Sequence, residues 1–68
     1  MALRAPEGAV TIRQQLQGIA RRGGLPLDRV VEEHAERAAI REYLGGMSRD
    51  EAEAAAVGDT ADVLGVPW

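Results

Sequence analysis

The fold is decided by the stretch GGMSRDEAEAAAVGDTADVLG, residues 45–65, which carries the clearest helix start in the sequence. Ser48 is followed three residues later by Glu51, the spacing of a capping box in which each side chain accepts a hydrogen bond from the other residue's backbone N–H. Asp50 adds a negative charge where the helix dipole is positive. The stretch therefore predicts a helix over 48–57. Its expected inward face consists of Ala52, Ala55 and Ala56.

The same stretch has the rhythm of a helix-turn-helix, a DNA-binding motif. Gly58 would be the turn glycine, and the sequence predicts that the helix ends there and that Asp59 caps a short helical turn over 59–64. In a helix-turn-helix the second helix enters the major groove. Asp59 and Asp62 would then face phosphates and be repelled, and no arginine follows them. We therefore predict that this element does not read DNA.

A second helix is predicted over 26–44, from Pro26 to the glycine pair Gly45 and Gly46. Its N-terminal half has one apolar face, whereas the apolar residues of its C-terminal half point almost the other way. The first set is Leu27, Val30, Val31, His34, Ala35 and Ala38, and the second set is Ile40, Tyr43 and Leu44. We expect the first set to pack on the preceding helix. The second set would meet another body, either the third helix or a second protein chain.

The first helix is predicted over 11–22, where Thr11 and Gln14 have capping-box spacing. Its apolar face consists of Ile12, Leu16, Ile19 and Ala20. Two arginines lie in its last turn, where the helix dipole favours cations, and Gly23 is expected to form the left-handed cap.

Residues 1–10 contain Pro6 and Gly8 and predict an arm, with at most a very short strand over 3–5. Together these elements predict one all-α domain over 1–68, a small three- to four-helix unit with an N-terminal arm.

The small size of the chain predicts that it associates with another chain. A core of 68 residues rarely stabilises a fold by more than about 3–5 kcal/mol. Because there is no cysteine, neither a disulfide nor a Cys-based zinc site is available to add to that. We expect partners to be the chain itself, as a homodimer or higher oligomer, or another protein.

Charge is distributed unevenly along the chain. Residues 1–30 hold five arginines against two acids, whereas residues 31–68 hold three arginines against nine acids, so the halves carry +3 and −6 and sum to the net charge of −3. A net-acidic chain is a poor general phosphate binder.

No run is apolar enough for a membrane span or a secretory signal, so we expect no membrane partner and a cytoplasmic location.

Side chains able to do chemistry are few, and each has a structural explanation. His34 is the only histidine and lies on an apolar stripe, so we expect a core or interface residue. Ser48 is expected to act as a cap. The acids at 32, 33, 36 and 42 are expected on solvent-facing arcs. We therefore predict no enzymatic activity, no catalytic residues, no cofactor and no metal site.

An apolar helical face is the best candidate for a binding site. It would consist of the anchor residues Ile40, Tyr43, Leu44 and Met47, flanked by Arg37 and Arg41. The sequence predicts a non-enzymatic protein-interaction module that acts through this face. The alternative for the same residues is that they simply cover the third helix.

Residues 3–44, LRAPEGAVTIRQQLQGIARRGGLPLDRVVEEHAERAAIREYL, give a second alternative. Their order of short strand, helix, Gly-containing turn and longer helix resembles the ribbon-helix-helix fold. That resemblance implies an obligate dimer that binds DNA as an antitoxin or repressor. The basic residues it would use are Arg4, Arg13, Arg21 and Arg22.

Residues 36–56, ERAAIREYLGGMSRDEAEAAA, are similar to a short helical segment of accessory and primase-like proteins of phages, plasmids and other mobile elements in bacteria. Leu44 stands where that segment usually has an acidic residue. The resemblance implies a docking or accessory role and carries no catalytic motif.

Overall fold

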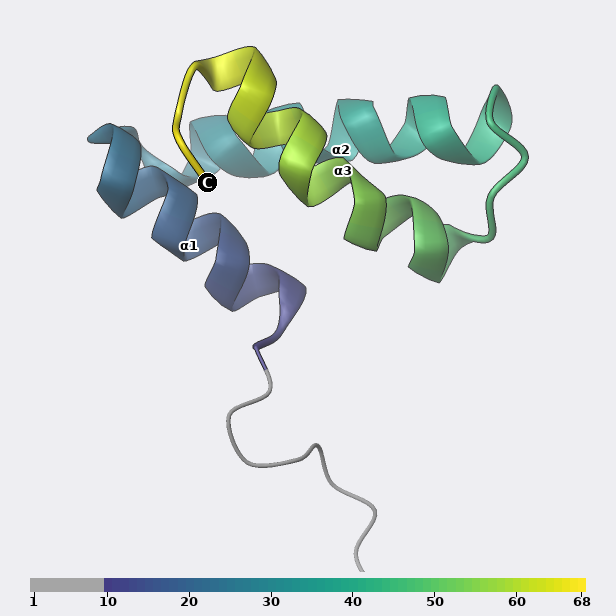
Figure 1. Cartoon of the computed structure of the whole chain (residues 1–68), viewed down its shortest axis with the longest axis horizontal. Coiled ribbons are helices and arrows are strands. Elements are labelled where there is room, and N and C mark those ends of the chain that lie inside the picture. Colours follow the sequence, from purple (N-terminus) through teal and green to yellow (C-terminus); the bar gives the residue numbers. More distant parts are fainter. Residues whose placement is uncertain (1–9) are drawn as a thin grey trace, which may run out of the picture.

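Three α-helices make up the computed structural model, which describes residues 10–68 (Figure 1). They are α1 (Ile12–Gly23), α2 (Leu27–Tyr43) and α3 (Arg49–Leu64), and residues 10–68 contain no strand. The all-α prediction is confirmed. The predicted arm, apart from Val10, and the predicted short strand over 3–5 lie outside the described residues.

Both predicted capping boxes are present. The backbone N–H of Gln14 donates to the Thr11 hydroxyl at 3.1 Å, and that of Glu51 donates to the Ser48 hydroxyl at 3.2 Å. The Gln14 and Glu51 side chains accept in return from the backbone N–H of the cap residues. These contacts satisfy N–H groups that would otherwise have no partner in the first turn. The starts of α1 and α3 are therefore specified by local sequence.

The turn after α1 differs by one residue from the prediction. Gly24, not Gly23, adopts the left-handed conformation, with φ of 65°. Gly23 is the last helical residue, and a Cβ built on it would lie 2.6 Å from the Val66 side chain. A close approach of the C-terminal segment thus explains the first glycine, and the backbone conformation explains the second.

The predicted break at Gly58 is wrong, because α3 continues without interruption through that residue to Leu64. Asp59 does not cap a new turn: its carboxylate binds Arg41 of α2. Val57 and Thr60, on either side of the glycine, are both buried, and the Thr60 hydroxyl donates to the Ala56 carbonyl at 2.6 Å. Tertiary packing of both halves therefore overrides the low helix propensity of glycine.

The core lies where the three helices meet. Its buried residues are Leu16, Ile19, Ala20, Val30, Val57, Ala61 and Val66. Val30 is completely buried, whereas Val31 and Ala35, which were predicted on the inward face of α2, are exposed. The buried face of α2 is therefore rotated from the predicted one, because it follows the contact with α3 along its whole length and not the contact with α1 alone.

α3 crosses α2 (Figure 1), and both helices bury alanines. Ala38 of α2 and Ala52 and Ala56 of α3 are all buried. Side chains this small let two helix backbones approach closely, although each buries little apolar area. Two of the three alanines predicted on the inward face of α3 are thus confirmed as buried, and Ala55 is half-buried.

We predict that Gly58→Ala stabilises the protein by about 0.5–1 kcal/mol, because alanine is the better helix former and a Cβ at this exposed position meets no atom within 4 Å. Urea unfolding followed by circular dichroism measures the change. Gly24→Ala is the control and should destabilise by about 1 kcal/mol, because φ there is 65°. Loss of stability in Gly58→Ala would contradict a continuous α3.

Candidate functional site

A cleft between α2 and α3 brings together three of the residues predicted for partner binding. Arg37, Ile40 and Arg41 of α2 line it with residues of α3 that the sequence did not single out. Those residues are Asp59, Asp62 and Val63. These six residues are called the α2–α3 cleft below. Its volume is about 260 Å³, which suits one or two side chains of a partner better than a whole small ligand.

An ion pair between Arg41 and Asp59 forms one wall of the α2–α3 cleft. Arg41 Nε donates to Asp59 Oδ2 at 2.7 Å and Nη2 donates to Oδ1 at 2.9 Å, so the pair is bidentate. These hydrogen bonds, and the positive charge itself, hold the pKa of Asp59 below its ordinary value of 3.8. The two charged groups of this pair therefore satisfy each other.

Arg37 is held by a carboxylate that the sequence placed in solvent. Glu33 is buried, its Oε2 lies 3.1 Å from Arg37 Nε, and Arg29 Nη1 lies 3.8 Å from its other oxygen. The prediction that Glu33 faces solvent is therefore wrong. The burial of a carboxylate is tolerated here because two arginines one helical turn away on either side neutralise it.

The apolar anchor residues Ile40, Tyr43 and Leu44 are all exposed, and their i, i+3, i+4 spacing places them on one side of α2. Ile40 is 43% exposed in the α2–α3 cleft next to Val63, which is 53% exposed, and Leu44 lies one turn beyond Ile40 with 83% of its surface exposed. Tyr43 is 75% exposed and lines a different groove along α2, with Val31. Met47 is half-buried in the turn before α3.

His34 is a core residue, as predicted. Its side chain is buried, and Nε2 lies 2.9 Å from the Glu53 carbonyl oxygen of α3. With a proton on Nε2, the imidazole donates this bond. Within residues 10–68 no three His, Asp or Glu side chains come close enough to hold a metal ion. The arrangement gives His34 a structural bond across the α2–α3 contact.

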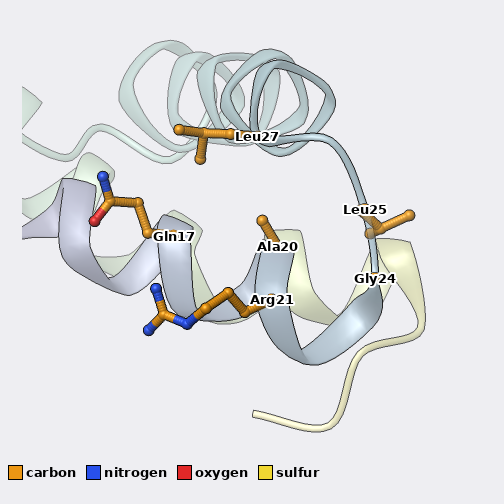
Figure 2. A pocket seen from close by; sticks show the side chains of 6 residues that line it. All are labelled: Gln17, Ala20, Arg21, Gly24, Leu25 and Leu27. Carbon is orange, nitrogen blue, oxygen red and sulfur yellow. The ribbon is translucent and has the colours of Figure 1, made fainter.

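A second surface lies at the junction of α1 and α2 (Figure 2). It is a wide, shallow hollow of about 620 Å³, called the α1 hollow below. Its lining residues are Gln17, Ala20, Arg21, Gly24, Leu25 and Leu27. Arg21 is exposed at its rim, whereas Leu25 and Leu27 are half-buried. The α1 hollow therefore combines an apolar floor with an exposed guanidinium.

Trp68 has a contact that sequence reasoning missed. Its ring lies against Gly18 of α1, where a Cβ would come within 2.7 Å of ring atom Cη2. The Arg22 guanidinium lies 5.5 Å from the ring centroid, and its Nη1 donates to the Pro67 carbonyl at 3.3 Å. A glycine within a helix otherwise disfavours helix formation, so Gly18 was the signal for this close approach.

The arginines proposed for DNA binding are spread around α1. Arg13, Arg21 and Arg22 are all exposed, but helical spacing places Arg21 about 80° and Arg22 about 180° around the axis from Arg13. Arg22 is also engaged by Trp68. Arg4 lies outside the described residues. The three described arginines therefore do not form a single row along one face.

Comparisons of the chain with protein-family models, with curated proteins and with solved structures gave no match. Within residues 10–68, no helix is both long and apolar enough to cross a bilayer. The assignment of function therefore depends on the surfaces described above.

We predict that the stabilising effect of the Arg41–Asp59 pair disappears in acid. The pKa of Asp59 is lower in the folded than in the unfolded chain, so the effect is fully present above pH 3.8 and is lost as the pH falls through the folded pKa. The free energy of unfolding of the wild type should therefore exceed that of Asp59→Asn at pH 7, and the gap should narrow as the pH falls below 3.8. Urea unfolding across this pH range measures it. A gap that does not depend on pH would show that the pair does not contribute.

We predict that Gly18→Ala displaces the Trp68 ring, because the new methyl group overlaps the ring edge. Trp68 is the only tryptophan, so its fluorescence emission reports its surroundings and should shift to longer wavelength. The helix itself should gain stability, by up to about 1 kcal/mol. Gly58→Ala is the control and should leave the emission unchanged. Unchanged emission in Gly18→Ala would place the ring elsewhere.

Proposed function

We propose that this protein is a small, non-enzymatic protein-interaction module that binds its partner through the α2–α3 cleft and Leu44. One observation carries the proposal: Ile40, Val63 and Leu44 are exposed together beside an ion pair whose charges already satisfy each other. Burial of apolar side chains drives association, and protein interfaces place such residues at their centre with polar groups around them.

The exposed apolar side chains at the end of α2 support a role in association with another chain. The large apolar side chains of Ile40 and Leu44 at the end of α2 are exposed, so they are not used in the core of the domain. Exposing Leu44 and Ile40 to water has a cost that binding would recover, at about 25 cal/mol per Å² of apolar surface covered. The resemblance of residues 36–56 to segments of mobile-element accessory proteins adds to this support, since it implies a docking role for the same stretch.

The ribbon-helix-helix alternative makes a different prediction about ligand and salt. Binding through arginines to phosphates releases counterions, so the affinity for duplex DNA must fall steeply as salt rises. Binding through Ile40 and Leu44 has little salt dependence of this kind and needs no DNA.

We predict that Ile40→Asp and Leu44→Asp abolish association while leaving the helical circular dichroism of the chain intact, because both side chains lie on the surface. Each variant is compared with the wild type by sedimentation velocity and by titration with any purified protein that the wild type captures. Val10→Asp is the matched control: it makes the same change at an exposed valine outside the α2–α3 cleft and should associate normally.

Association of both variants as tight as that of Val10→Asp would overturn the proposed function. Salt-sensitive binding of a random-sequence duplex that survives Leu44→Asp would favour the ribbon-helix-helix alternative instead.

A further inference from the structure

The charges of the described helices separate into a basic and an acidic side. α1 contains three arginines and no acid, whereas α3 contains five acids and one arginine. Of the α1 arginines, Arg22 is bound to the C-terminal segment, but Arg21 makes no ion pair within residues 10–68. Of the two acids at the α2–α3 cleft, Asp59 is bound to Arg41, whereas Asp62 makes no ion pair within the same residues. Each of the two apolar surfaces therefore has one charged side chain without an ion pair inside residues 10–68. It is the positive Arg21 at the α1 hollow and the negative Asp62 at the α2–α3 cleft.

Each of these two charges lies beside apolar side chains. The α1 hollow is concave and has Leu25 and Leu27 in its wall with Arg21 at its rim. The edge of the α2–α3 cleft presents Val63, 53% exposed, directly after Asp62 on α3. A valine side chain fits an apolar hollow, and the carboxylate next to it would lie beside the guanidinium.

We propose that the protein self-associates head to tail, the α1 hollow of one copy receiving Val63 and Asp62 of the next. The inference rests on the proposed function, since it names a second copy of this chain as the partner of the α2–α3 cleft. Because the two contacting surfaces differ, the contact is heterologous: successive copies close into a ring or continue as a filament. A two-fold dimer through the α2–α3 cleft alone would instead pair two copies of the surface that carries Asp62 and leave Arg21 outside the contact.

A charge swap tests this arrangement. Arg21→Glu and Asp62→Arg should each weaken self-association by about tenfold or more, since each places like charges opposite one another. An equimolar mixture of the two variants should recover association, because the hollow of the Arg21→Glu variant then meets the reversed charge of the Asp62→Arg variant, and the remaining native pair forms at the other contact. Sedimentation velocity of each variant and of the mixture gives the readout, and circular dichroism confirms that each variant is folded.

Controls and opposing outcomes separate this inference from the proposed function. Arg13→Glu and Glu32→Arg make the same kind of charge reversal at exposed positions that line neither surface, and both should associate normally. Raising the salt from about 0.05 to about 0.5 M should weaken the self-association of the wild type without abolishing it, because salt screens the charges but not the apolar contact.

A monomeric wild type, or normal association of Arg21→Glu, would overturn the head-to-tail contact. Association lost in Ile40→Asp but kept in Arg21→Glu would retain the proposed function and assign the cleft to another partner.

Discussion

The rest of the structure depends on the close crossing of α2 and α3. Ala38 of α2 and Ala52 and Ala56 of α3 are buried but provide little apolar area, so they favour a short distance between the helices more than a strong contact. Directional bonds on either flank then fix the angle: Arg41 binds Asp59 on one side, and His34 binds the Glu53 carbonyl on the other. With two fixed points on α3, the helix cannot rotate or slide without breaking one of them. α1 and the C-terminal segment complete the core against this pair of helices.

Elements specified by local contacts could be predicted from the sequence. Both capping boxes, at Thr11 and Ser48, join residues three positions apart, and both are present. The apolar face of α1 also follows directly from helical spacing, and its residues Leu16 and Ile19 are buried. Helical spacing places His34 in the core by the same reasoning. In each case a few neighbouring residues contain all the information that the local structure needs.

The errors arise where a distant residue decides the outcome. Gly58 predicts a helix end, but Asp59 is bound by Arg41 of α2 and Thr60 is buried. These tertiary contacts keep the helix continuous. Glu33 looks like a surface acid, yet the direction of the buried face of α2, set by α3, turns it inward between two arginines.

The C-terminal segment shows how so small a core is completed and how this shapes the surface. Val66 is buried against Gly23, and Trp68 covers Gly18, so both glycines of α1 make room for residues more than forty positions away. The segment thereby occupies one side of α1 and binds Arg22, leaving Arg21 exposed beside the α1 hollow. The end of α2 follows the same pattern, since Arg41 is used by Asp59 and Leu44 is left uncovered. The core thus uses residues from all three helices and the C-terminal segment, while Ile40, Leu44 and Arg21 stay on the surface, where another chain could contact them.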